Sequence, residues 1–70
     1  MDGLTNGRIV HCVVDGKHRA AIITRVWTDD GIVNLFVFPD ASYEDQNNFR
    51  TSVEYDENNS EYTWHWIEKA

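Results

Sequence analysis

The stretch "RIVHCVVDGKHRAAIITRVW" (residues 8–27) decides the fold, because it holds two apolar runs joined by a strong turn signal. The first run, 8–14, is rich in β-branched residues and ends at Asp15-Gly16, a dipeptide typical of a two-residue hairpin turn. The second run, 18–27, follows at once and is again apolar with few breaks. We therefore predict two adjacent antiparallel strands here.

Three more strands are predicted downstream of this hairpin. The run 31–38 follows a second Asp-Gly turn signal and stops at Pro39, which cannot donate to a strand ladder. The runs 50–55 and 61–67 complete the set and are joined by the polar turn "DENNS". Apolar residues do not recur at helical spacing anywhere. The sequence thus predicts an all-β fold, a small five-stranded antiparallel SH3-like barrel or curled sheet, with consecutive strands as neighbours.

The length of 70 residues allows one domain, which we place at 7–70 after a flexible N-terminus at 1–6. The single cysteine, Cys12, excludes an intrachain disulfide and lies in an apolar run, so we predict a buried thiol. No Cys or His spacing typical of zinc is present, and we predict neither a metal site nor a cofactor.

The net charge of −6 arises entirely from Gly31 onward, because acidic and basic residues balance before it. This balance argues against binding to duplex nucleic acid, which requires a basic surface. A small anionic ligand needs only two or three arginines and stays possible. No apolar stretch is long enough for a signal peptide or a membrane span, and we predict a soluble, cytoplasmic protein.

The second and third predicted strands are apolar on both faces, and a barrel interior covers only one of them. We therefore predict a homo-oligomer. The residues predicted to lie at its interface are Ile22, Ile23, Leu35 and Phe36.

The three histidines are assigned separate roles. His11 lies in the middle of a strand and is predicted to be half-buried and hydrogen-bonded, or alternatively to line a pocket; His18 is predicted to face solvent. His11 or His65 could form an acid–base pair with a carboxylate, but the sequence selects none of the candidates Glu54, Glu68 and Asp40. Without a catalytic motif, we predict that the protein is not an enzyme and has no catalytic residues.

Arginines and tryptophans occur together in two places. In the second strand, Arg25 and Trp27 are predicted to share a face with Ala21 and Ile23. There Arg25 and Trp27 form either a ligand site or a simple cation–π contact. In the last strand, Trp64 and Trp66 are predicted to be buried on one face with Tyr62, with His65 on the other face beside Thr63 and Ile67. The full set of predicted ligand-binding residues is Arg8, His11, Arg25, Trp27, Trp64, His65 and Trp66.

Five strings between residues 7 and 68 carry a resemblance: "GRIVH", "RAAIITRVW", "VNLFVFPD", "TSVEYDE" and "TWHWIE". They resemble a group of short proteins encoded in tailed-phage and prophage genomes. The resemblance implies a phage origin and a location in the host cytoplasm, and it carries no established functional residues. In those proteins the last strand often reads Trp-His-Trp-Pro, whereas Ile67 follows Trp66 here.

Two functional hypotheses follow. The first is an oligomer that binds a nucleotide-like anion at its subunit interfaces, such as an anti-defence protein that sequesters an immune second messenger. The second is an SH3-like interaction module, or an inhibitor of a host protein, that uses the acidic loops 40–49 and 56–61. The loop 40–49 is the longest connection, and we expect it to fold back onto the domain.

Overall fold

The computed structural model describes residues 1–39 and 48–68, and these residues form a single five-stranded sheet. The strands are β1 (Ile9–Val14), β2 (Lys17–Val26), β3 (Val33–Val37), β4 (Phe49–Val53) and β5 (Trp64–His65). The described residues contain no helix, so none is available to cross a membrane. The all-β prediction is confirmed.

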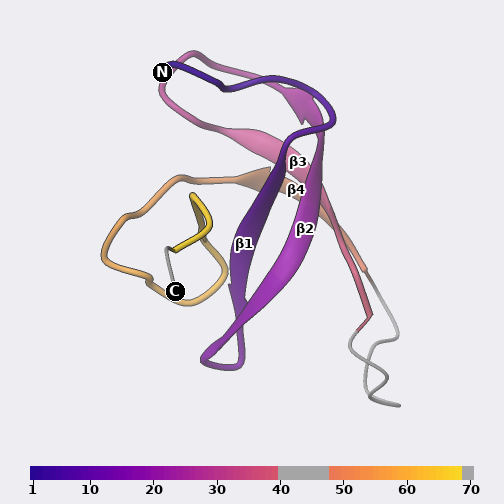
Figure 1. Ribbon diagram of the computed structural model, residues 1–70, viewed down its shortest axis with the longest axis vertical. Helices are drawn as coiled ribbons and strands as arrows, with labels where there is room; N and C mark the ends of the chain where they lie inside the picture. Colours follow the sequence, from indigo (N-terminus) through magenta and orange to yellow (C-terminus); the bar gives the residue numbers. More distant parts are fainter. Residues whose placement is uncertain (40–47, 69–70) are drawn as a thin grey trace.

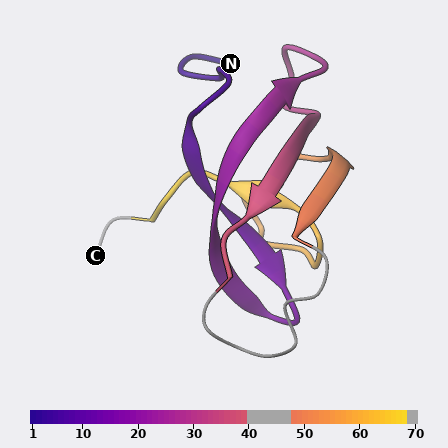
Figure 2. The same ribbon diagram turned by 90° about the vertical axis from the view of Figure 1, so that its right-hand side faces the viewer.

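The sheet is strongly curled into a half-barrel, with the strand order β4-β3-β2-β1-β5 (Figures 1 and 2). All of its strand pairs are antiparallel. β5 lies beside β1 rather than beside its sequence neighbour β4, so the prediction that consecutive strands are neighbours is wrong for this last pair. A parallel bridge between Tyr55 and Trp64 then links the chain after β4 to β5. The two ends of the half-barrel therefore approach each other around the core.

The core occupies the inner face of this half-barrel. Trp64 is its largest buried side chain, and its indole N–H donates a hydrogen bond of 2.6 Å to the carbonyl oxygen of Gly31. The other buried members are Val10, Cys12, Ala21, Ile23, Val33, Leu35, Val37 and Val53. The buried position predicted for Cys12 is confirmed, and burial raises the pKa of its thiol.

The first hairpin has the predicted turn. Asp15 and Gly16 both adopt positive φ angles, 53° and 75°, which a type I′ turn requires. The carboxylate of Glu61 accepts hydrogen bonds from the backbone N–H groups of both residues. The turn pairs Val14 with Lys17 and Val13 with His18, so it fixes the register of the whole hairpin.

A bulge in β2 changes the predicted alternation. Ile23 lies in the core, but the pairing register with β3 shifts between Ile23 and Arg25. Beyond this bulge Val26 packs against the core, and Arg25 and Trp27 lie on the exposed side. The predicted grouping of Ile23 with Arg25 and Trp27 on one face is therefore wrong.

The last strand is shorter than predicted. Tyr62 has a φ of 62° and is 59% exposed, because the chain turns through residues 60–63 before it joins β1. Tyr62 therefore does not share a buried face with Trp64, as predicted. Trp64 is fully buried and Trp66 is half-buried, with their rings edge-to-face at 5.0 Å.

Part of the predicted oligomer interface lies inside the chain itself. Ile23 and Leu35 are 1% and 0% exposed within one chain, so their assignment to a subunit interface is wrong. Ile22 and Phe36 are half-buried on the outer face, where Phe36 packs against Phe38 and Phe49. Oligomerisation stays a prediction.

The predictions for the two segments 1–6 and 40–49 both stay predictions. At the N-terminus, Leu4 packs against the core, and the Met1 amino group donates to the carbonyl of Asp29. The flexibility of residues 1–6 stays a prediction. Most of the predicted loop 40–49 lies outside the described residues.

Candidate metal centre

The register of three strands gathers the histidines on the outer face of the sheet. His11 of β1 lies directly opposite His65 of β5, and residues directly opposite share a face. His18 of β2 lies opposite Val13, which is two residues from His11 and therefore on the same face. The centroids of the three imidazole rings are 4.7 to 6.3 Å apart.

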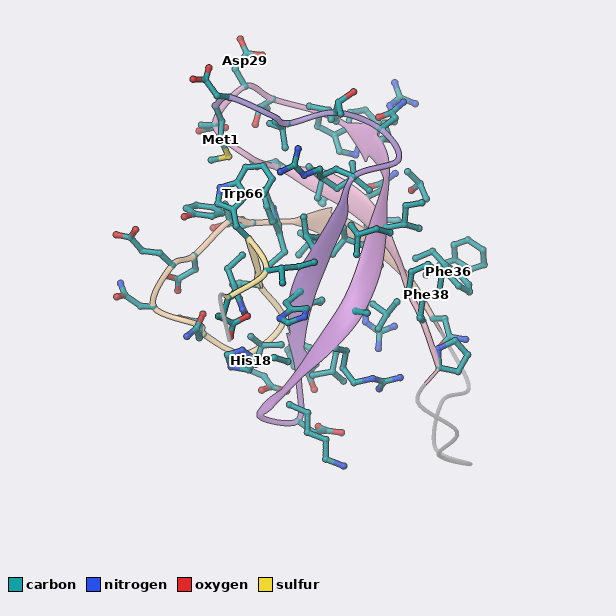
Figure 3. The ribbon with its side chains drawn as sticks, in the orientation of Figure 1. Met1, His18, Asp29, Phe36, Phe38 and Trp66 are labelled. Carbon is teal, nitrogen blue, oxygen red and sulfur yellow. The ribbon has the colours of Figure 1, made fainter. Side chains whose placement is uncertain are left out.

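Glu68, just after β5, places its carboxylate among these rings. One of its oxygens is 2.5 Å from Nδ1 of His11 and 2.9 Å from Nε2 of His65. The other oxygen contacts Nδ1 of His18. His18 lies toward the C-terminal segment, well away from Phe36 and Phe38 (Figure 3).

The four side chains offer one ligand atom each, and these atoms all lie within 4.8 Å of one another. His65 is 4% exposed, and its Nδ1 atom is buried without a hydrogen-bond partner among the described residues. The His11, His18 and Glu68 side chains are 24%, 33% and 45% exposed. The cluster is thus anchored by one buried imidazole and open to solvent on its other side.

The contacts of Glu68 change its acidity. Desolvation raises the pKa of this carboxyl, but hydrogen bonds from the three imidazoles and from the backbone outweigh it and lower the pKa from 4.5 to about 2. The carboxylate is therefore ionised at neutral pH. A negative charge among three imidazole nitrogens is a donor set that suits a divalent transition metal ion.

The predicted ligand-binding residues fall into separate groups. His11 and His65 belong to the cluster, and Trp64 belongs to the core. Arg8 lies over the ring of Trp66, with 5.3 Å from guanidinium carbon to ring centroid, and both line a pocket. Arg25 lies over the exposed ring of Trp27 at 3.9 Å, as the cation–π alternative describes, and it does not line that pocket.

His18 was not predicted as a member of the site, and Glu68 was not selected among the candidate carboxylates. The position of His18 could have been found, because a two-residue Asp-Gly turn fixes which residues of the hairpin share a face. The position of Glu68 could not, because the pairing of β5 with β1 has no local sequence signal. His18 is exposed, as predicted, although its ring also contacts Glu68.

No protein-family model, curated protein or solved structure matches the chain. The function is therefore inferred from the geometry of the site.

Proposed function

We propose that this protein binds a divalent transition metal ion, and Zn²⁺ first of all, through His11, His18, His65 and Glu68. The observation that carries the proposal is the convergence of four ligand atoms from β1, β2, β5 and the chain after β5 within 4.8 Å. One nitrogen of each imidazole already contacts the Glu68 carboxylate. A small rotation of these side chains would let the nitrogens and one carboxylate oxygen surround an ion. The earlier expectation of no metal site is replaced by this proposal.

The donor set favours zinc over the common hard cations. Imidazole nitrogen is a preferred ligand of Zn²⁺, and four protein ligands suit its tetrahedral geometry. Ligands about 2.1 Å from a central ion lie about 3.4 Å apart in a tetrahedron, so modest side-chain rotations suffice from the present spacing. Mg²⁺ and Ca²⁺ require mostly oxygen ligands and are expected to bind weakly.

The proposed role of the ion is to fasten the C-terminal segment to the sheet. β5 has two residues, and Glu68 lies beyond it. An ion held by Glu68 and by histidines of β1 and β2 would join these three parts of the chain, which contains no disulfide. Four protein ligands leave no open position in a tetrahedral set, so we propose a site that holds its metal without catalysis.

The direct test is metal binding by the purified chain after treatment with EDTA. Isothermal titration with Zn²⁺ should give one ion per chain, and Co²⁺ should give visible absorption bands of a tetrahedral site. At a free metal concentration about 100 times Kd, the expected stabilisation is about 2.7 kcal/mol, or about 10–20 °C in Tm for a domain of this size. Mg²⁺ should leave Tm unchanged.

Two carboxylates make a matched pair of variants. Glu68→Gln removes the charged ligand and should weaken Zn²⁺ binding at least about tenfold. Glu57→Gln changes an exposed acid outside the cluster and should leave binding unchanged. Equal Zn²⁺ affinity in both variants, or no metal-dependent rise in Tm, would disprove the proposal.

The predicted nucleotide-like ligand has one supporting observation, the pocket that contains Arg8 and Trp66. We propose binding of such a ligand in this pocket as a second candidate function. The sequestering of a second messenger and the phage origin stay predictions. For the alternative interaction module, two carboxylates of the acidic loop 56–61 already accept hydrogen bonds within the chain: Asp56 from Asn58 and Ser60, and Glu61 from the hairpin turn at Asp15 and Gly16.

A further inference from the structure

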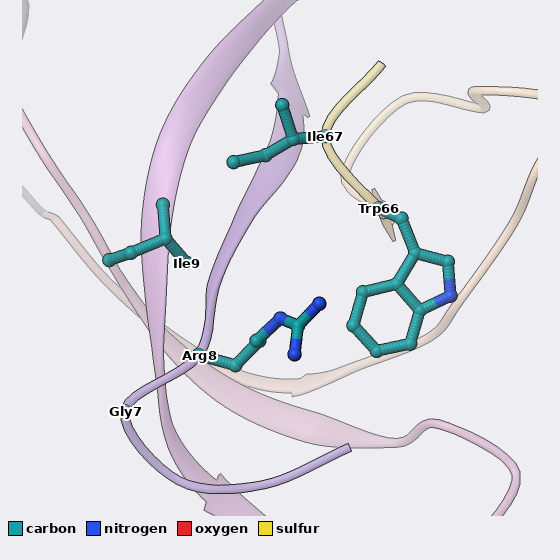
Figure 4. A pocket seen from close by; sticks show the side chains of 5 residues that line it. All are labelled: Gly7, Arg8, Ile9, Trp66 and Ile67. Atoms are coloured by element: carbon teal, nitrogen blue, oxygen red, sulfur yellow. The ribbon is translucent and has the colours of Figure 1, made fainter. Parts of the chain in front are cut away.

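A pocket opens where β1 and the C-terminal segment separate. Their pairing includes His11 with His65 and Cys12 with Trp64, but it does not extend to Ile9 and Ile67. The two segments leave a pocket of about 440 Å³ between them, lined by Gly7, Arg8, Ile9, Trp66 and Ile67 (Figure 4). This volume is within the range of pockets that hold small molecules, about 300–1,000 Å³.

A backbone bulge directs Arg8 to this pocket. Gly7 donates its N–H to the carbonyl of Ile23, and Ile23 donates its own N–H to the carbonyl of Arg8, so two residues oppose one. Gly7 has a φ of 87°, a backbone conformation that glycine adopts readily and residues with a side chain rarely adopt. A bulge of this kind re-aims the side chain that follows, and here that side chain is Arg8.

The charge of Arg8 is available to a ligand. Its guanidinium makes no ion pair with any carboxylate of residues 1–39 and 48–68, in a chain whose net charge is −6. Its cation–π contact with Trp66 uses a face of the guanidinium and leaves the N–H groups at its edge able to bind a carboxylate or phosphate at two points. The pocket therefore presents a positive group at one wall.

The other walls of the pocket are mainly apolar, and one of them is the indole of Trp66. Ile9 and Ile67 are 39% and 49% exposed at the pocket, an unusual exposure for isoleucine. Trp66 is held edge-to-face against the buried Trp64, which fixes the orientation of its indole. An indole face beside a guanidinium suits a flat ring that carries an anionic group.

We infer that this pocket binds a small molecule in which a flat ring carries a phosphate or carboxylate. Arg8 would bind the anion, and Trp66 and the two isoleucines would contact the ring. The inference does not depend on the metal centre, because none of the five lining residues is among the four proposed metal ligands. It narrows the earlier ligand hypothesis to one pocket within a single chain and removes Arg25 and Trp27 from it.

The test compares four probes by isothermal titration and by two-dimensional NMR of the ¹⁵N-labelled chain. Adenosine monophosphate joins a ring to a phosphate, and indole-3-acetate joins a ring to a carboxylate. Adenosine and inorganic phosphate are the ring and the anion alone. We expect at least one of the joined probes to bind at least about tenfold more tightly than either part and to shift the indole N–H signal of Trp66, assigned with Trp66→Phe.

Two arginines that both lie over tryptophan rings supply the control. Arg8→Ala should lower the affinity for the joined probe at least about tenfold, whereas Arg25→Ala should leave it unchanged. The titrations are run in EDTA, so that a phosphate cannot bind through the ion, and repeated on the zinc-loaded chain with indole-3-acetate. Failure of both joined probes in EDTA together with failure of indole-3-acetate on the zinc-loaded chain, equal loss in the two variants, or signal shifts centred on Trp27 would overturn the inference.

Discussion

Replacing Trp64 with Ala should remove most of the stability of this domain. The side chain is 0% exposed, packs edge-to-face on Tyr55 and Trp66, and donates to the carbonyl of Gly31. Truncating a buried tryptophan and leaving its acceptor unpaired cost together about 4–8 kcal/mol. The whole stability of a chain of this length is about 3.5–10 kcal/mol. We expect Trp64→Ala to be marginally folded or unfolded at 25 °C.

Urea unfolding followed by circular dichroism measures the loss, and two other tryptophans calibrate it. Trp66 is half-buried, so Trp66→Ala should lose less than the 3–5 kcal/mol that full burial implies. Trp27 is 49% exposed, and Trp27→Ala should lose about 1 kcal/mol or less. Trp64→Phe, which keeps a ring but no N–H, should fall between Trp27→Ala and Trp64→Ala. If Trp64→Ala were no less stable than Trp27→Ala, the assignment of the core would be wrong.

Three further predictions concern the supports of the sheet and the cluster. Gly31→Ala should destabilise the fold by at least about 1–3 kcal/mol in urea unfolding, because a Cβ there lies 2.8 Å from that of Tyr55 at a φ of 109°; an unchanged midpoint would contradict this. Asn34→Ala should cost about 1–2 kcal/mol in the same assay, because Oδ1 accepts from Trp27 Nε1 and from the N–H of Ser52 at the β4 bulge, with Thr51→Ala as the neutral control. In EDTA, the ionised Glu68 stabilises the fold above pH 4.5, and this contribution is lost as the pH falls to about 2, so the stability of Glu68→Gln should vary less between about pH 5 and pH 2. Parallel stability curves for Glu68→Gln and the unchanged chain would refute the last prediction.

The sequence was sufficient for the local parts of this fold. The turn at Asp15-Gly16 and the burial of Cys12 were predicted from neighbouring residues, and the structure has both. The errors occurred where backbone irregularities change the side-chain period. The bulge after Ile23 reverses the faces of β2, and such a bulge depends on the register of the partner strand rather than on a local motif.

The candidate site was harder to predict because its members come from different strands. His11 and His65 are 54 positions apart and meet only because β5 crosses back to β1. Sequence reasoning assigned each histidine a separate environment, and the absence of a short metal motif then counted against a metal. Ligands gathered by sheet register leave no such motif, since their spacing in the sequence is set by the strand order.

The last segment of the chain, residues 64–68, is where the core, the cluster and the pocket meet. Trp64 fills the core, His65 and Glu68 contribute to the cluster, and Trp66 and Ile67 line the pocket. An ion held through His65 and Glu68 would restrict the two residues between them, which form one wall of the pocket. Binding at either place would then favour the same position of the segment, and linkage requires each ligand to change the affinity of the other by the same factor. The Zn²⁺ affinity measured with and without indole-3-acetate should therefore show the same ratio as the indole-3-acetate affinity measured with and without Zn²⁺, and a ratio of one in both would mean that the pocket wall is fixed by Trp64 alone.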